Sequence, residues 1–146
     1  MNECLKIHRL ANTCAAGPRV LRPFAGLLRH LNQLLFACHI GSNAQIGEGC
    51  IFQHNGVGTV ISDHAVIGKN CIIYQGVTIG VIEDGSNAAP HLGNEVIVGA
   101  NSTLLGDIAI GDRAKIGAGA VVLRDVPEGC TAVGVPAAIL WSTIDQ

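Results

Sequence analysis

A six-residue repeat of large apolar side chains runs through most of this chain, from residue 40 to residue 122. A helical face has a period of 3.6 residues and a half-buried strand has a period of two, so neither element explains this spacing. Two longer steps, of nine and thirteen residues, divide the repeat into three registers. The registers are Ile40, Ile46 and Phe52; Ile61, Ile67, Ile73 and Ile79; and Leu92, Val98, Leu104, Ile110, Ile116 and Val122.

Small residues accompany the large ones at fixed places in the repeat. Glycine directly follows eight of the thirteen large residues, and a small residue such as Ala44, Cys50 or Ala65 often precedes them by two positions. One large inward side chain per six residues, with glycine allowing the backbone to bend, predicts a parallel β-helix with three hexads in each coil. Each coil then pairs with its neighbours and stacks its aliphatic side chains into a continuous core. A β-sandwich fits poorly, because it predicts irregular spacing and alternating burial.

Composition agrees with one domain that binds small molecules. Of the 146 residues, 49% are hydrophobic but only 3% are aromatic, and 19 are glycine, which suits a narrow core of branched aliphatic side chains. The formal net charge is -2 and no run of Lys or Arg occurs. The sequence therefore argues against nucleic-acid binding and against a polybasic membrane patch. We expect small molecules and further copies of the chain as partners.

The cysteines and the N-terminal residues indicate a reducing compartment. The six cysteines lie far apart, without the short spacing of a zinc or redox pair, and free thiols are the simplest interpretation. The first residues include several charges and no uninterrupted apolar stretch of the signal-peptide kind. We therefore predict a cytoplasmic protein. The cysteines are Cys4, Cys14, Cys38, Cys50, Cys71 and Cys130.

Residues 1–38 differ from the repeat and predict a short helical cap, followed by a β-helix domain over 39–140 and a tail over 141–146. Leucines at 27, 28, 31, 34 and 35 trace one face of a second helix after Pro23. We favour a role for this stripe in covering the open end of the first coil, where unpaired strand edges would invite aggregation. Attachment to a membrane surface, with Arg19, Arg22 and Arg29 beside the leucines, is the less favoured alternative.

The first interruption of the repeat carries His54, our candidate catalytic residue. Three extra residues between Phe52 and Ile61 form a bulge, and Gly56 and Gly58 allow it to turn sharply. An imidazole on such a raised edge can accept the proton of a hydroxyl that attacks a thioester. The alternative is a histidine that only bonds a local carbonyl, and we favour catalysis.

The repeat, with the closing run IGAGAVVLRDVP at 116–127 and GVPA at 134–137, resembles the hexapeptide-repeat acyltransferases over about residues 35–140. The segments HNGVGTVI at 54–61 and YQGVTIG at 74–80 resemble the serine acetyltransferase branch, which includes acetyltransferases of polysaccharide synthesis. The resemblance implies an all-β, left-handed parallel β-helix. It also implies acetyl-CoA as acetyl donor to a hydroxyl, His54 as catalytic residue, and a homotrimer with active sites between subunits.

The chain departs from the serine acetyltransferase pattern where serine would be held. That branch has an Asp at the position of His39 and an Arg-His pair at Ala88 and Ala89, before Pro90. The segment AAPHLGN at 88–94 looks more like the loop of saccharide acetyltransferases, so we expect a saccharide hydroxyl as acceptor, with His39 and His91 as acceptor-binding residues. A serine O-acetyltransferase of cysteine biosynthesis and a non-catalytic trimeric scaffold are the alternatives.

Acetyl-CoA is expected in a groove between two prisms. By resemblance its pantetheine would meet the backbone at Gly80, Ala100 and Ala118. Lys115 and Arg124 are candidates for its phosphate or adenine end, because the family's usual cation after the Pro-Ala pair is missing. No metal is expected: β-helix enzymes of the carbonic-anhydrase kind hold a metal with three His, two of them five residues apart. No pair among the histidines at 39, 54, 64 and 91 has that spacing.

Overall fold

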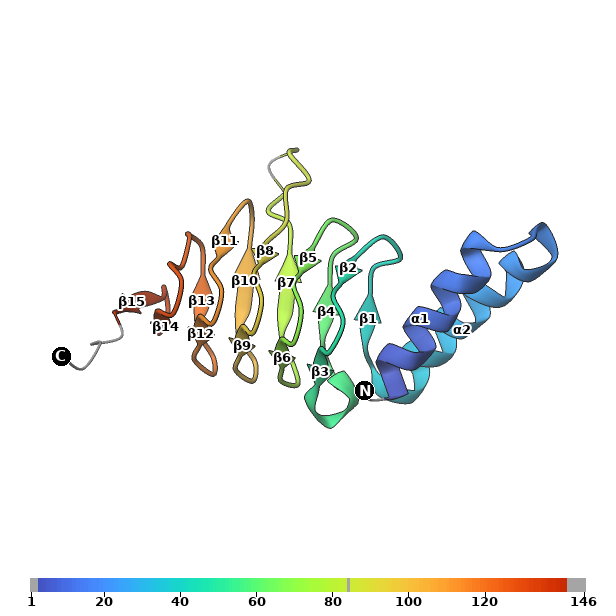
Figure 1. Cartoon of the computed structure of the whole chain (residues 1–146), viewed down its shortest axis with the longest axis horizontal. Coiled ribbons are helices and arrows are strands. Elements are labelled where there is room, and N and C mark those ends of the chain that lie inside the picture. Colours follow the sequence, from blue (N-terminus) through green and yellow to red (C-terminus); the bar gives the residue numbers. More distant parts are fainter. Residues whose placement is uncertain (1–2, 84, 142–146) are drawn as a thin grey trace.

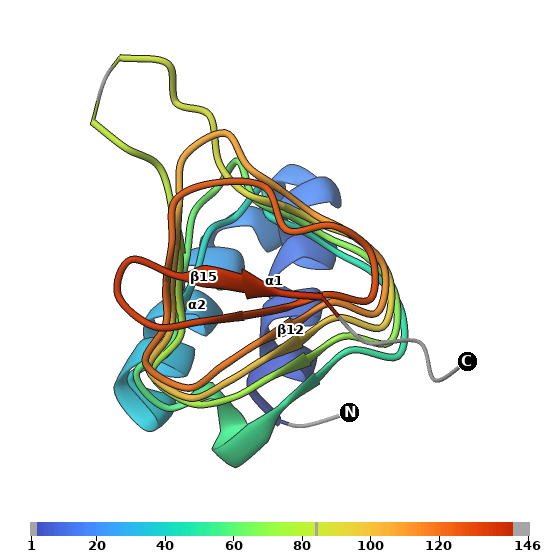
Figure 2. The same ribbon diagram turned by 90° about the vertical axis from the view of Figure 1, so that its left-hand side faces the viewer.

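The computed structural model describes residues 3–83 and 85–141, which form a helical hairpin followed by a β-helix (Figure 1). Every β-helix strand contributes to one of three parallel sheets. The sheets have the orders β1-β4-β7-β10-β13, β2-β5-β8-β11 and β3-β6-β9-β12-β14, and β15 adds to the last sheet in the antiparallel sense. Viewed along its axis, the chain winds in stacked triangular coils (Figure 2). The predicted parallel β-helix is confirmed.

The strands are short, as the hexad spacing predicts. The first coil has β1 (His39–Ile40), β2 (Gln45–Ile46) and β3 (Ile51–Phe52), and the second has β4 (Val60–Ile61), β5 (Val66–Ile67) and β6 (Ile72–Ile73). The third has β7 (Thr78–Gly80), β8 (His91–Leu92) and β9 (Ile97–Val98), and the fourth has β10 (Thr103–Leu105), β11 (Ala109–Ile110) and β12 (Lys115–Ile116). β13 (Val121–Val122), β14 (Thr131–Val133) and β15 (Ala138–Leu140) close the C-terminal end.

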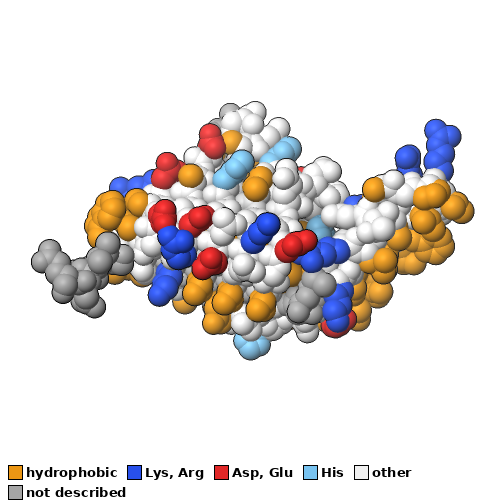
Figure 3. Space-filling model, viewed as in Figure 1, with side chains coloured by type: hydrophobic (Ala, Val, Ile, Leu, Met, Phe, Trp, Pro, Cys, Tyr) orange, Lys and Arg blue, Asp and Glu red, His pale blue; other side chains and the backbone are white. Residues whose placement is uncertain are grey.

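The helical hairpin consists of α1 (Glu3–Ala16), the short 3-10 helix η1 (Arg19–Leu21) and α2 (Arg22–Phe36). Leu5 and Cys4 of α1 are fully buried and join the core of the first coil, so α1 does cover that end. The predicted covering role of the α2 leucines is wrong, because Leu27 and Leu34 are 63% and 70% exposed. Figure 3 shows hydrophobic side chains gathered on the outer surface of the hairpin. No helix within the described residues is long and apolar enough to cross a membrane.

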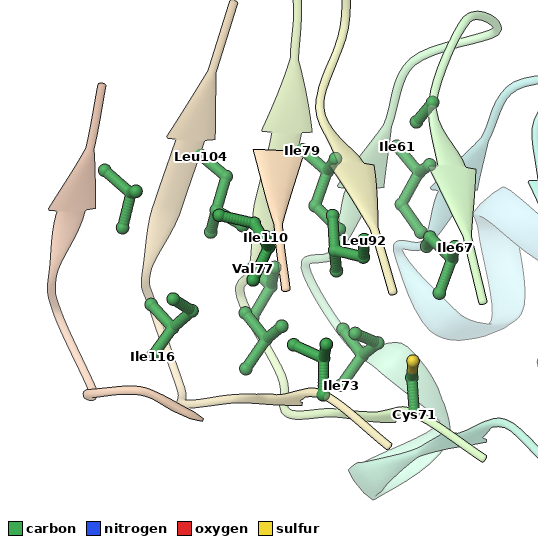
Figure 4. Packing of buried hydrophobic residues seen from close by; sticks show 14 of the residues in the cluster. Ile61, Ile67, Cys71, Ile73, Val77, Ile79, Leu92, Leu104, Ile110 and Ile116 are labelled. Atoms are coloured by element: carbon green, nitrogen blue, oxygen red, sulfur yellow. The ribbon is translucent and has the colours of Figure 1, made fainter. Parts of the chain in front are cut away.

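The core is the column of large residues that the hexads predict (Figure 4). Twelve of the thirteen are buried, and Ile46 on the edge strand β2 is half-buried. Small side chains such as Ala65, Cys71 and Ala120 are buried two positions earlier. With a gain of about 1.5 to 3 kcal/mol for each buried aliphatic side chain, this column is the main apolar contribution to stability.

The glycines of the repeat serve close packing between coils more than bending. None of the eight, all of them among the described residues, adopts a positive φ. A Cβ on Gly99 would lie 2.6 Å from the backbone nitrogen of Ala118 in the next coil, so the stacking leaves no room for a side chain. The left-handed residues lie two positions further on, as at Asn70 and Asn101.

Two regions lie outside the regular coils. The thirteen-residue step between β7 and β8 extends from the prism as a loop (Figures 1 and 2), of which residue 84 lies outside the described residues. Of the predicted tail, only Trp141 is described, and it is 71% exposed. None of the six cysteines, all of which lie among the described residues, forms a disulfide bond.

Candidate active site

The predicted bulge after β3 is present as the short 3-10 segment η2 (Gln53–Gly56). His54 (φ 52°, ψ 36°) and Asn55 (φ 56°, ψ 24°) both adopt the left-handed backbone conformation. The turn is closed by two backbone bonds: the N–H of Val57 donates to the His54 carbonyl (3.3 Å), and that of Thr59 donates to the Gly56 carbonyl (2.9 Å). The sequence therefore builds a defined corner here.

Contacts from three directions hold the bulge. A Cβ on the buried Gly56 would lie 3.2 Å from both the Cys38 sulfur and the Phe52 ring, which is a tight contact, and the φ of 67° at this residue also favours glycine. The Gly76 N–H of the next coil donates to the Val57 carbonyl (2.9 Å). From the other side, the backbone N–H of Glu3 in α1 donates to Oδ1 of Asn55 (3.3 Å). The hairpin, the core and the second coil thus position the residue pair 54–55.

The His54 side chain projects into solvent from this fixed corner. Among the described residues of the same chain, its imidazole makes no hydrogen bond, so the alternative of a local carbonyl bond is not observed. Both ring nitrogens are therefore available to a substrate or to another subunit. A base needs this accessibility to meet an acceptor hydroxyl.

Two of the predicted acetyl-CoA residues lie on the same corner of the prism as His54. All three residues lie two positions after the inward-facing residue of a strand: His54 after β3, Ala100 after β9 and Ala118 after β12. The Gly119 N–H donates to the Ala100 carbonyl (2.8 Å), which stacks the two turns directly. The two turns of this corner at Ala100 and Ala118 therefore present small residues, on the C-terminal side of the bulge.

Sequence reasoning missed Gln75, which occupies this corner between His54 and Ala100. On its N-terminal side, the neighbouring turn at this corner is the bulge. On its C-terminal side, the carbonyl of Gln75 accepts a hydrogen bond from the Asn101 N–H (3.0 Å). The side-chain Oε1 is buried without a hydrogen-bond partner among the described residues. Gln75 lies two positions after the inward-facing Ile73, just as His54 lies two positions after Phe52. This equivalent place in the repeat could have identified Gln75 from the sequence.

The other three predicted acetyl-CoA residues lie elsewhere on the protomer. Lys115 is exposed on β12, between Ile97 and Thr131 of the neighbouring strands. Gly80 ends β7, and its carbonyl accepts a bond from the Gly106 N–H (3.1 Å). Arg124 follows β13 at the same corner as Gly80, and its Nη2 donates to the Ala137 carbonyl (3.4 Å). A single chain does not gather all five residues at one place.

Of the two predicted acceptor-binding histidines, His39 lies beside the end of the bulge, where its backbone N–H donates to the Thr59 carbonyl (2.9 Å), and His91 lies in a different sheet. His39 is exposed on β1 and lines a cavity beneath the helical hairpin. His91 is exposed on β8, in a different sheet, and lines a shallow hollow with Asp107 and Asp125. Within the described residues, no group of three His, Cys, Asp or Glu side chains is placed to hold a metal ion.

Comparisons with known proteins agree with this architecture. The family described as "Bacterial transferase hexapeptide (six repeats)" matches residues 89–124, and "Hexapeptide repeat of succinyl-transferase" matches residues 58–86. The chain is 46% identical over 116 residues to the serine acetyltransferase of Synechococcus elongatus, covering 79% of this chain and 47% of that protein. It is 44% identical over 117 residues to the serine acetyltransferase of Helicobacter pylori strain 26695, covering 77% of this chain and 68% of the relative.

A solved structure extends the match to three dimensions. Soybean serine acetyltransferase complexed with serine superposes with a TM-score of 0.84 at 40% identity, covering 94% of this chain and 56% of the soybean chain. This likeness confirms the left-handed sense of the β-helix. The present chain spans about half the length of the cyanobacterial and soybean proteins. On its repeat, its coils and these identities, the chain belongs to the serine acetyltransferase family of hexapeptide-repeat, left-handed β-helix proteins.

Proposed function

We propose that this chain is an acetyl-CoA-dependent O-acetyltransferase that transfers an acetyl group to the hydroxyl of serine. The observation that carries the proposal is the His54 imidazole, held on a rigid bulge with both nitrogens accessible, in a member of this family. The relatives described above are named as serine acetyltransferases, and the soybean structure is named as a complex with serine. The saccharide acceptor that the sequence favoured has no support among these relatives, so serine becomes the first candidate.

In the proposed mechanism, His54 acts as general base. It accepts the hydroxyl proton while the serine oxygen attacks the thioester carbonyl of acetyl-CoA. The tetrahedral intermediate then collapses, the carbon–sulfur bond breaks, and the imidazolium returns the proton to the departing CoA thiolate. General base catalysis of this kind contributes roughly 10² to 10⁴ in rate. Backbone N–H groups along the corner would stabilise the oxyanion.

We further propose a homotrimer in which each active site lies between two copies. In one chain, His54 and Ala118 occupy one corner, whereas His91 and Gly80 occupy other parts of the prism. In a closed ring of identical copies, each contact joins one part of a chain to a different part of its neighbour. A neighbouring copy can therefore place its His91 and Gly80 opposite His54 and Ala118 of the first copy. Acetyl-CoA would then lie along the small-residue corner, with Lys115 and Arg124 as candidate contacts. The cytoplasmic location stays a prediction.

A saccharide hydroxyl remains a second candidate acceptor because of specific residues. His39, Ala88 and Ala89 stand where serine acetyltransferases are expected to have an Asp, an Arg and a His. In the structure Ala89 is buried and Ala88 is half-buried, so neither offers a charged group to a serine carboxylate. A serine substrate would need other contacts, and a sugar would not need that carboxylate-binding group.

The decisive experiment measures thiol release from acetyl-CoA with L-serine, other amino acids, monosaccharides and nucleotide sugars. We expect L-serine to support turnover and His54→Ala to lower kcat by about 100-fold or more. His64→Ala is the matched control, because His64 is an exposed histidine at another corner of the prism. Selective use of a sugar would establish the second candidate. If no acceptor gives release that depends on His54, the scaffold alternative replaces the enzyme.

A further inference from the structure

Four of the six cysteines, although far apart in sequence, form two pairs of neighbouring thiols in the structure. Cys50 and Cys71 lie at equivalent positions, directly before β3 and β6, and hydrogen-bond each other. Cys4, in the first turn of α1, and Cys38, directly before β1, also hydrogen-bond each other. The backbone around the two pairs differs, and this difference decides which pair can form a disulfide.

The Cys4–Cys38 pair lies against the base of the bulge. A Cβ on Gly56 would be 3.4 Å from the Cys4 sulfur and 3.2 Å from the Cys38 sulfur, so both sulfurs flank one point. Cys4 is 0% exposed and Cys38 is 1% exposed. The hydrogen bond with Cys4 and this burial raise the pKa of the Cys38 thiol. Cys38 is therefore unreactive while α1 is in place, because the thiolate is the form that reacts.

Neither Cys4 nor Cys38 is fixed by a strand ladder. Cys38 belongs to the two-residue link between α2 and β1, and Cys4 belongs to a helix end. Such segments can adjust to the Cβ separation of about 3.5 to 4.5 Å that a disulfide requires. Cys71 is different, because its carbonyl accepts the Ile51 N–H of the adjacent strand (2.9 Å). The strand spacing of about 4.8 Å holds Cys50 and Cys71 beyond that separation.

The first turn of α1 gives an oxidant a route to the Cys4–Cys38 pair. Two contacts of this turn are a hydrogen bond from the Glu3 N–H to Oδ1 of Asn55 (3.3 Å) and an ion pair between Glu3 and Lys6, and both are exposed. Exposed ion pairs contribute little to stability, and helix ends open locally at low cost. Opening of this turn exposes the Cys4 sulfur and at the same time removes the α1 support from the bulge.

We propose that Cys4 and Cys38 are an oxidisable dithiol, which hydrogen peroxide converts into a disulfide that ties α1 to the base of the bulge. In the opened turn, the Cys4 sulfur attacks one peroxide oxygen, the O–O bond breaks, and the thiol proton leaves with the second oxygen as water. The Cys38 sulfur then attacks the resulting sulfenic acid, the S–O bond breaks, and another water leaves. Two thiols thus lose two electrons and two protons, and one peroxide becomes two water molecules.

Such a disulfide restrains the turn that would otherwise open. Because Cys38 directly precedes β1, a bond to it keeps the first turn of α1 beside the bulge. The support that α1 gives to Asn55 then persists, and opening of the bulge becomes rarer. Amide hydrogen exchange measures such opening, and the Thr59 N–H, bonded to the Gly56 carbonyl (2.9 Å), lies at the end of the bulge. We expect exchange at Thr59 to be at least tenfold slower in the oxidised chain.

The test treats the full chain with about a tenfold excess of hydrogen peroxide and identifies linked peptides by mass spectrometry without reduction. Trypsin together with a glutamate-specific protease cuts after Glu48 and so separates Cys38 from Cys50. We expect residues 4–6 to be linked to residues 30–48, and dithiothreitol to split the two peptides. Exchange at Thr59 is then compared between the oxidised and the reduced chain.

Two cysteine variants serve as the matched comparison. Cys14→Ser changes a half-buried cysteine of α1 outside the pair, so it should still form the link and slow the exchange, whereas Cys38→Ser should do neither. Absence of the link at this excess of peroxide, unchanged exchange at Thr59 in the linked chain, or equal slowing in peroxide-treated Cys38→Ser would each overturn the proposal. The link and the exchange are both measured on the wild-type chain, so they decide the matter even if a variant fails to fold.

Discussion

At the scale of single residues, the bulge shows how the chain pays a local conformational cost where the chemistry is expected. His54 and Asn55 are consecutive non-glycine residues with positive φ, which costs of order 1 kcal/mol or more for each residue. Such a conformation persists only when its surroundings enforce it. Here the enforcement comes from Gly56 against the core and from the Glu3 N–H on Asn55.

A second residue-scale consequence concerns His8, whose pKa is lowered from 6.5 to about 4 by burial and by the nearby Arg29 and Arg9. Because the folded-state pKa lies below the unfolded value, the unfolded chain binds more protons between pH 6.5 and pH 4. The free energy of unfolding must therefore fall as pH is lowered through this window. Between pH 7.5 and pH 5 we expect a loss of about 2 kcal/mol from this group.

Urea unfolding at the two pH values measures this loss. His8→Gln should remove most of the pH dependence, since glutamine does not titrate, and the exposed His64→Gln should retain it. Parallel pH profiles for His8→Gln and the wild type would show that His8 is not the titrating group. Asp63, whose pKa lies below its ordinary value of 3.8, affects stability only at lower pH.

Sequence alone predicted the inward-facing residues almost completely, because burial of one large side chain per hexad is a local and repeated constraint. It also predicted the bulge, because counting through an interrupted repeat exposes the three extra residues before Ile61. It could not predict the partnerless atoms of Arg29, Asn32 and Gln75. Those depend on which distant elements meet, and no periodicity encodes that.

At the scale of elements, α2 shows the same limit. Its leucine stripe correctly predicted an amphipathic helix. A stripe of apolar residues does not indicate, however, which other element of the fold packs against it. The structure packs the face with Ala25 and Asn32 inward and leaves most of the leucines exposed. Leu5 of α1, which belongs to no such stripe, fills the end of the core instead.

Truncation of one leucine from each helix tests this assignment. Leu5→Ala should lower the free energy of unfolding by about 2 to 5 kcal/mol, as expected for a fully buried leucine. Leu34→Ala, at a position 70% exposed, should change it by about 0.5 kcal/mol or less. Urea denaturation at two protein concentrations measures both. A large loss for Leu34→Ala that grows on dilution would show that another copy covers this face.

At the scale of the whole molecule, charge is segregated along the chain. Five of the six charged residues between 3 and 37 are basic, whereas nine of the thirteen between 38 and 141 are acidic. If two copies meet, the hairpin of one and the β-helix of the other carry opposite net charge, which favours their approach. This asymmetry, together with the exposed leucines of α2, is consistent with the trimer that we propose.

Mixed trimers test whether each active site is shared between copies. His54→Ala and His91→Ala alter groups on different parts of one chain, so each variant alone should lose activity, by about 100-fold and roughly tenfold respectively. If His54 of one copy works opposite His91 of the next, random mixing in equal amounts restores an intact pair at roughly a quarter of the interfaces. Acetyl transfer after joint unfolding and refolding should then recover to about that fraction of the wild-type rate. Recovery no greater than the mean of the separate variants would place the site within one chain, and full activity of His91→Ala alone would remove that residue from the site.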